Sequence, residues 1–171
     1  IDLRAAMRRG CRVMGLCGGY QMLGRTIADP EGLEGAPGTD PGLGLLDVDT
    51  VMATDKRVTL THAYHPATGT AVQGYEIHLG RTEGADRARP LFTVDGRPEG
   101  AVSADGRVMG SYLHGMFSAD VFRAAFLRTL GATPGDLSYD AGVEATLDAL
   151  ADHLAAHTDA DALLAIARAG A

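Results

Sequence analysis

The stretch VMGLCGGYQMLG, residues 13–24, decides the fold of this chain. We expect it to form a short buried strand, a tight turn that carries Cys17, and the beginning of a helix. The pattern Gly15-x-Cys17-x-Gly19 is the cysteine version of a nucleophile elbow, a sharp strand-to-helix turn that exposes a reactive side chain. Such a turn is strained and crowded, and glycine lets the backbone pass close to itself. The stretch therefore predicts an α/β fold with Cys17 at the end of a strand.

The position of Cys17 at a helix start favours a reactive role. A helix that begins at Gly18 would direct its free N–H groups and its positive dipole end at the sulfur, which favours the thiolate. The same N–H groups can hold the oxyanion of an acyl intermediate. The alternative is that Cys17 is simply buried, as free cysteines often are. Gly18 and Gly19 argue against this, since each should weaken the helix by about 1 kcal/mol without an evident gain in stability.

Length and composition exclude several classes of protein. The chain has 171 residues, is 46% apolar and carries a formal net charge of −7, which fits one globular domain with a sizeable core. The negative charge argues against a nucleic-acid partner. There is no long apolar run and no signal peptide, so no membrane partner is expected. The two cysteines, Cys11 and Cys17, lie too near each other for a disulfide framework and fit a reducing cytoplasm.

Periodicity and turn residues predict the other elements. The Gly- and Pro-rich residues 31–44 should form a loop, Thr54-Asp55-Lys56 a turn, and Ser118 the N-cap of a helix. Leu147, Leu150 and Leu154 should form a buried stripe. An α/β domain rarely starts within a helix, so we expect further elements of the domain to precede Asp2. The predicted helices are 2–9, 18–27, 119–130 and two within 142–169 with a break near Thr158-Asp159. The predicted strands are 11–16, 45–53, 58–61, 71–79, 91–94, 101–103 and 107–113, and the Asp105-Gly106 turn should join the last two into a hairpin.

A cysteine nucleophile needs a base, and His114 is the best candidate. It ends the apolar run 108–113 and is followed by Gly115, so it could reach across a sheet edge to a neighbouring elbow. A histidine satisfied in the core or in a loop has the same local pattern. The spacing alone supports a catalytic base and a structural histidine about equally.

Alternation along residues 74–78 places Glu76 and His78 on one face of a strand, with Tyr75 and Ile77 on the other. A polar pair of this kind usually marks a solvated face, and less often the wall of a site.

The other histidines predict no metal site. His62 and His65 lie in a stretch without regular periodicity, and no cysteine or carboxylate accompanies them. His153 and His157 are four residues apart on a predicted helix, a spacing that can hold a metal, but no third ligand is near. Lys56 is the only lysine, and no phosphate loop of the G-x-x-x-x-G-K-S/T type exists. A nucleotide-driven reaction is therefore not supported by this chain alone.

Four motifs together resemble a known family. They are LCGGYQMLG at 16–24, GLGLLD at 42–47, GYEIHLGRT at 74–82 and SYLHGMF at 111–117. They are similar to the C-terminal glutamine amidotransferase domain of cobyric acid synthases, as is LDALADHL at 147–154. The combination of GYEIH with YLHG is specific, whereas the elbow is shared by the wider class I superfamily. The resemblance implies one amidotransferase domain over residues 1–171, with a flavodoxin-like class I sheet and flanking helices that lacks its first N-terminal elements.

The resemblance also implies roles for single residues. Cys17 would attack the side-chain amide of glutamine and release ammonia, with His114 as general base and acid. The Gly18 N–H would form half of the oxyanion hole, and Gln21 would help to hold substrate. The better-known class I triad has an acid two residues after its histidine, where this chain has Met116. Another group, or none, would then orient His114, and Glu76 is a possible substitute.

In this family the ammonia passes to an ATP-dependent synthetase domain, which amidates peripheral carboxylates of adenosylcobyrinic acid a,c-diamide. That domain lies N-terminal in the family and is not in this chain. We therefore expect no cofactor here, and ATP and Mg only in the synthetase domain. One alternative is the amidotransferase subunit that acts on lipid II in cell-wall synthesis, which shares a CGGYQ-like elbow but is disfavoured by GYEIH and YLHG. A non-catalytic interaction domain is the other.

Overall fold

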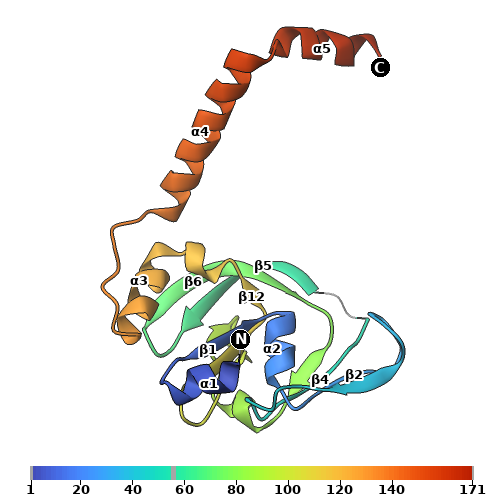
Figure 1. The fold of residues 1–171 in the computed structure, drawn as a ribbon, viewed down its shortest axis with the longest axis vertical. Coiled ribbons are helices and arrows are strands. Elements are labelled where there is room, and N and C mark those ends of the chain that lie inside the picture. The colour runs from blue at the N-terminus through green and yellow to red at the C-terminus, as the bar shows by residue number, and fades with distance from the viewer. Residues whose placement is uncertain (1, 55–56, 171) are drawn as a thin grey trace. The chain divides into compact units, whose positions relative to one another are not determined.

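The computed structural model describes residues 2–54 and 57–170, so the turn predicted at Thr54-Asp55-Lys56 and the lone Lys56 fall largely outside the described residues. The chain divides into two compact units, Ile1–Pro134 and Gly135–Ala171. The first unit combines three sheets with helices, which confirms the predicted α/β class (Figure 1).

A three-stranded sheet carries the elbow. Its central strand β11 (Val108–Ser111) pairs in parallel with β1 (Val13–Leu16) and antiparallel with β10 (Ala101–Val102). The hairpin predicted around Asp105 is confirmed, because the Asp105 carboxylate accepts from the Ser103 hydroxyl and the Arg107 N–H across the turn. The predicted single run 107–113 is wrong. It ends at Ser111, and β12 (Leu113–His114) joins a different sheet.

The second sheet has the order β12-β6-β5-β8-β9 and encloses the larger core. Helix α3 (Asp120–Thr129) packs against β6, and the side chains of Phe92, Phe122 and Leu113 in this core are at most 1% exposed. The strands and the short helix before α3 are β5 (Arg57–His65), β6 (Thr70–His78), β8 (Phe92–Val94), β9 (Arg97–Glu99) and η2 (Met116–Ser118).

One expectation about α3 is wrong. The N-cap is Ala119, because the Ser118 hydroxyl donates to the Gly115 carbonyl at 2.8 Å. Phe122 and Phe126 of α3 are buried, whereas Leu130 is its C-cap and is 45% exposed.

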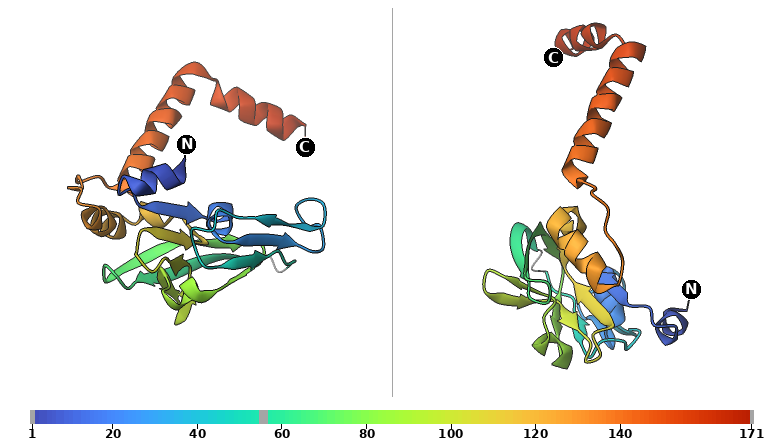
Figure 2. Two further views of the ribbon diagram at one scale, coloured as in Figure 1. Left: turned by 60° about the horizontal axis from the view of Figure 1, so that its bottom comes forward. Right: turned by 90° about the vertical axis from the view of Figure 1, so that its left-hand side faces the viewer.

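The third sheet, of order β3-β2-β4-β7, corrects two further expectations. The elbow helix α2 (Gly18–Leu23) is shorter than the predicted 18–27, because Gly24 is extended and the β-branched Thr26 and Ile27 continue into a strand. Part of the predicted 31–44 loop also forms a strand, which pairs with the preceding one and makes a ribbon at one end of the unit (Figure 2). The strands and the short helix that follows them are β2 (Thr26–Asp29), β3 (Gly38–Pro41), β4 (Asp49–Val51), β7 (Arg81–Glu83) and η1 (Ala85–Ala88).

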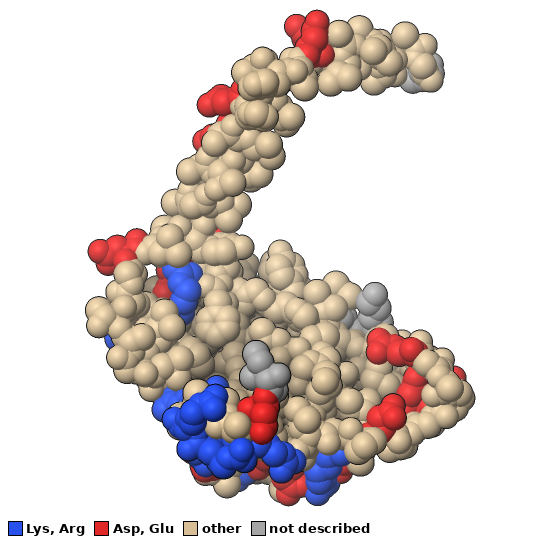
Figure 3. All heavy atoms as spheres, in the orientation of Figure 1, with Lys and Arg blue, Asp and Glu red and all other residues tan. Residues whose placement is uncertain are grey.

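Helix α1 (Leu3–Arg8) precedes the elbow strand, as predicted, with Asp2 as its N-cap. The Asp2 side chain accepts from the Ala5 N–H at 3.1 Å. Basic side chains gather over α1 on the face of the unit shown in Figure 3, and acidic side chains gather at the end formed by the β2–β3 ribbon.

The second unit consists of α4 (Tyr139–His157) and α5 (Ala160–Ala169). The predicted break near Thr158-Asp159 is confirmed, with Asp159 as the N-cap of α5. The predicted buried leucine stripe is wrong: Leu147, Leu150 and Leu154 are about half exposed, and no residue of either helix is buried. Among the described residues of this unit, neither α4 nor α5 buries the stripe. Among the helices in the described part of the chain, none has the length and apolar character needed to cross a bilayer.

Candidate active site

The turn between β1 and α2 has the strained geometry expected of an elbow. Cys17 has a φ of 53°, a left-handed conformation that costs energy for a residue with a Cβ. A Cβ on Gly15 would lie 2.5 Å from the Gly19 carbonyl oxygen, so a glycine is required at this position. A Cβ on Gly18 or Gly19 would meet nothing within 4 Å. Crowding therefore explains Gly15 but not the two glycines after the cysteine, which leave open space beside it.

The Cys17 backbone and sulfur contact two different strands. The Cys17 N–H donates to the Ser111 carbonyl at 2.9 Å, which continues the pairing of β1 with β11. The Cys17 thiol donates to the Ile77 carbonyl, with an Sγ–O distance of 3.6 Å. The elbow is thus held where β11 ends and β6 ends.

His114 lies on the strand that adjoins this place. It occupies β12 and is in register with Tyr75 of β6, so its side chain shares a face with Tyr75 and Ile77. The His114 Nε2 atom is buried and has no hydrogen-bond partner among the described residues. The structure therefore brings the ends of β11 and β6 together at Cys17, and the adjoining strand β12 carries a histidine nitrogen with no hydrogen-bond partner in the described part of the chain.

Gln21 of the elbow helix is buried, and its side-chain amide forms a hydrogen bond within the protein. Its Nε2 donates to the Leu79 carbonyl at 3.1 Å and lies 3.9 Å from the Met52 sulfur. The side chain links α2 to the segment that follows β6.

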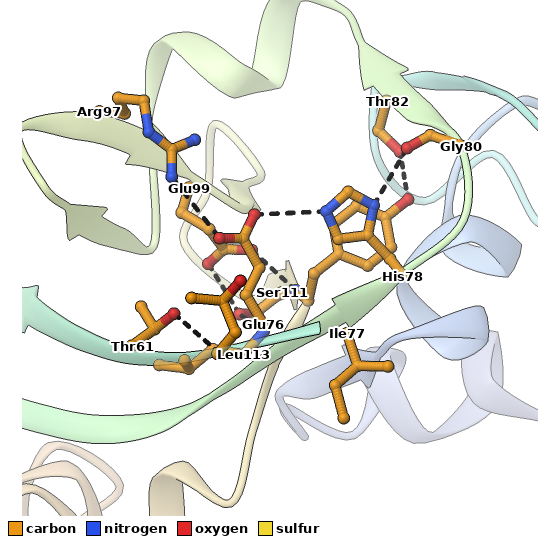
Figure 4. A network of polar contacts seen from close by, with 12 residues as sticks. Thr61, Glu76, Ile77, His78, Gly80, Thr82, Arg97, Glu99, Ser111 and Leu113 are labelled. Atoms are coloured by element: carbon orange, nitrogen blue, oxygen red, sulfur yellow. Dashed lines mark hydrogen bonds and ion pairs between the residues drawn. The ribbon is translucent and has the colours of Figure 1, made fainter. Parts of the chain in front are cut away.

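Glu76 and His78 share one face of β6, as alternation predicts, and this face is not solvated. Glu76 is 5% exposed and its Oε1 lies 3.3 Å from the His78 Nε2, while Oε2 lies 3.5 Å from the Arg97 guanidinium (Figure 4). The His78 ring stacks on Tyr112 with 4.1 Å between ring centroids. Glu76 therefore lies opposite the face that His114 shares with Tyr75, and the geometry assigns Glu76 to His78 and Arg97 rather than to His114.

This face of β6 forms one wall of a cavity of about 240 Å³. Tyr20 of the elbow helix also lines it, is 1% exposed, and has a hydroxyl without a hydrogen-bond partner among the described residues. Burial raises the pKa of Tyr20 above the usual range, with smaller contributions from neighbouring charges. Besides Tyr20, Glu76, His78 and Arg97, the cavity is lined by Ala53, Gly80, Arg81, Thr82, Glu83, Arg87, Pro98, Glu99, Gly100 and Tyr112.

Two residues next to the elbow were not predicted as site residues from the sequence. Glu99 is 7% exposed and accepts hydrogen bonds from the Ser111 hydroxyl and the Tyr112 N–H. Ser111 is fully buried. Glu99 belongs to none of the quoted motifs, and Ser111 begins the SYLHGMF motif, in which His114 alone carried a predicted catalytic role.

The remaining histidines do not form a site. His62 and His65 lie in the regular strand β5, contrary to the expected irregular stretch, and His65 is buried against Phe92 and Phe122. His153 and His157 both lie on α4, and their rings stack on each other. In the described residues, no group of three or more His, Cys, Asp or Glu side chains is placed to hold a metal ion.

A strained cysteine between a parallel strand and a helix is the architecture of enzymes that use a nucleophile elbow. Residues 1–122 match the model of the family described as the CobB/CobQ-like glutamine amidotransferase domain. The chain belongs to this family.

Relatives named cobyric acid synthase are similar over nearly the whole chain. The proteins from Rhodobacter capsulatus and Cereibacter sphaeroides are each 67% identical over 168 residues, which is 98% of this chain and 35% of the relative. The protein from Bradyrhizobium diazoefficiens is 59% identical over the same length. The chain thus spans about a third of the length of the curated relatives it matches, with 35% covered in each of these cases.

Proposed function

We propose that this chain hydrolyses glutamine at Cys17 and supplies the ammonia for amidation of cobyrinic acid a,c-diamide carboxylates, which yields cobyric acid. The observation that carries the proposal is the positive φ of Cys17 on an elbow, in a chain of this amidotransferase family. Relatives that share two thirds of the residues carry the name cobyric acid synthase, which supports the choice of acceptor.

The proposed reaction begins when the Cys17 thiol leaves the Ile77 carbonyl and gives its proton to His114. The thiolate adds to the side-chain amide carbon of glutamine, and the oxyanion that forms is held by the Gly18 N–H at the open helix start. His114 returns the proton to the departing nitrogen, so that ammonia leaves and a thioester remains. Water, deprotonated by His114, then cleaves the thioester to glutamate and restores the thiol. The buried His114 Nε2, which has no hydrogen-bond partner among the residues described, supports this role.

Gln21 is proposed to fix the glutamine pocket, since its amide ties the elbow helix to the segment after β6. Glu76 and His78 are proposed to form a wall behind the site. This chain has no phosphate loop, so the proposal places ATP and Mg in a synthetase part of the protein and assigns no cofactor to the chain described here. We place the reaction in the cytoplasm.

Thiol labelling and turnover test the proposal together. In the intact protein, a glutamine-like chloroketone should label Cys17 rapidly and stoichiometrically and should spare the exposed Cys11, as measured by peptide mass spectrometry. Cys17→Ser should abolish glutamine-dependent amidation while amidation with added ammonia survives, because the amidation step does not use the thiol.

Cys11→Ser is the matched control and should keep parental turnover. Parental glutamine hydrolysis by Cys17→Ser would refute the nucleophile. An absence of chloroketone labelling in the parent would favour a non-catalytic interaction domain. Transfer of the ammonia to lipid II in place of the cobyrinic acid diamide would favour the cell-wall alternative.

A further inference from the structure

The backbone between β11 and β12 changes sheets within one residue. Ser111 ends the strand that pairs with the elbow strand, and Leu113 begins the strand that pairs with β6. Ser111, Tyr112 and Leu113 are all buried, with at most 6% exposed. A buried chain that leaves one ladder for another needs new partners for its N–H groups.

The Glu99 carboxylate provides these partners. Its Oε1 accepts from the Tyr112 N–H at 2.7 Å, and its Oε2 accepts from the Ser111 hydroxyl at 2.8 Å. The Ser111 Oγ in turn accepts from the Leu113 N–H at 2.9 Å. One side chain from β9 therefore satisfies two successive backbone N–H groups, one directly and one through Ser111 (Figure 4).

The same three residues hold the groups of the proposed reaction. The Ser111 carbonyl accepts from the Cys17 N–H at 2.9 Å, and His114 directly follows Leu113. The fixed backbone of residues 111–113 therefore lies between the elbow and the histidine.

The pairing of Tyr112 with Ile77 shows what the Glu99 carboxylate changes in the local hydrogen bonding. These residues continue the register of β12 with β6, and the Ile77 N–H donates to the Tyr112 carbonyl at 3.3 Å. A regular antiparallel pair of this kind exchanges two such bonds. Here the Tyr112 N–H is directed to Glu99 instead, and the Ile77 carbonyl accepts the Cys17 thiol.

We propose that Glu99 is a positioning residue of the amidotransfer reaction, whose carboxylate clamps residues 111–113 and so keeps Cys17 and His114 at one strand junction. The proposal rests on the roles proposed above for Cys17 and His114. Without the carboxylate, the Tyr112 N–H is free to turn to the Ile77 carbonyl, which moves the backbone that carries both the Ser111 carbonyl and His114.

The clamp needs an acceptor at both of its oxygen positions. Burial raises the pKa of Glu99, while the hydrogen bonds from Tyr112 and Ser111 act in the opposite direction. Glutamine has the same shape but only one acceptor oxygen. Glu99→Gln can therefore keep the bond from the Tyr112 N–H, but its amide NH₂ faces the Ser111 hydroxyl and reverses the direction of that bond.

The test compares kcat with KM for glutamine hydrolysis in the intact protein. Glu99→Gln should lower kcat by about 10²-fold, the usual cost of a small misplacement of reacting groups, while the KM for glutamine changes little. Chloroketone labelling of Cys17 should slow in parallel, and alkylation of the exposed Cys11 should not change. Glu83→Gln is the matched control, because Glu83 lines the same cavity and, within the residues that the structure describes, its exposed side chain pairs with Arg87 and not with residues 111–113.

Ser111→Ala provides a second variant in case Glu99→Gln does not fold, which the absence of a cooperative unfolding transition would show. This variant removes the hydrogen bond from the Leu113 N–H to the Ser111 hydroxyl and leaves the bond from the Tyr112 N–H to Glu99. The kcat should therefore fall by about tenfold, as for the loss of one hydrogen bond. Parental kcat in a folded Glu99→Gln protein, or in Ser111→Ala when Glu99→Gln does not fold, overturns the clamp. Equal losses in the Glu83→Gln control also overturn it. A parent protein that shows no glutamine turnover refutes the proposed function itself, which separates the two failures.

Discussion

Residues 2–134 and residues 135–170 differ in how they use apolar and charged side chains. The first unit buries two hydrophobic clusters and has nearly balanced charge, whereas no residue of the helices in the second unit is buried. The second unit contains seven acidic residues and one arginine, so it carries most of the net charge of −7. Figure 3 shows acidic side chains along this unit. The comparison teaches that a regular leucine stripe predicts a helix but does not predict what covers it.

The first prediction asks whether chemistry is confined to the first unit. His114→Ala should slow glutamine hydrolysis by about 10²–10⁴-fold, the usual cost of losing a general base. His78→Ala should cost much less, since His78 faces Glu76 and Tyr112. His153→Ala in α4 should leave turnover unchanged. Steady-state glutaminase assays of the intact protein measure all three, and a larger loss from His78→Ala than from His114→Ala would show that the base is misassigned.

The second prediction concerns packing under the elbow helix. A Cβ on Gly110 of β11 would overlap the ring of Tyr20, which is 1% exposed. Gly110→Ala should lower the free energy of unfolding by about 1–3 kcal/mol, as overpacked cores do. Chemical denaturation of the intact protein, followed by a probe in this unit, measures the change. A neutral effect would mean that the Tyr20 ring can move aside.

The third prediction makes a glycine-to-alanine substitution in the second unit, where we expect it to stabilise the protein rather than destabilise it. Gly142 lies in α4, where a Cβ would meet nothing within 4 Å. Gly142→Ala should stabilise this helix by about 1 kcal/mol through helix propensity alone. Slower amide hydrogen exchange along residues 139–157 would show the gain. Faster exchange would indicate a contact at Gly142 that the isolated unit does not contain.

Local patterns in the sequence predicted the parts of the site that one stretch of chain forms by itself. Gly15 and Cys17 marked the elbow, and alternation placed Glu76 and His78 on one face of β6. The hairpin at Asp105 and the break at Asp159 were predictable for the same reason, since each depends on a turn or cap within a few residues.

Features that depend on distant residues were not predictable. The run 107–113 looks like one strand, and only the contact of Glu99 with Ser111 and Tyr112 shows why it divides between two sheets. Likewise, Thr26 and Ile27 follow a helical pattern in sequence but pair with β4, which lies more than twenty residues later. Tertiary pairing overrides a local pattern in both cases.

The last and smallest prediction concerns acid stability, and it separates a buried histidine of the first unit from an exposed one of the second. His65 is 4% exposed, and its ring lies 5.2 Å from that of Phe122. Burial lowers the pKa of His65 below its ordinary value of about 6.5. In the unfolded chain His65 titrates near 6.5, so below this pH the unfolded chain binds more protons than the folded protein does. The free energy of unfolding should therefore decrease as the pH falls from about 6.5 toward the lower pKa of the folded state, and this contribution is fully present above 6.5.

Denaturant titrations at about pH 5.5 and about pH 7.5 bracket this window on its acid and neutral sides. The parent should lose more stability between the two pH values than His65→Leu, which cannot take up the proton. His157→Gln, on the exposed surface of α4, is the control and should follow the parent. An identical loss in the parent and in His65→Leu would show that another group causes the acid sensitivity, and that burial of His65 beside Phe122 costs nothing when the ring is protonated.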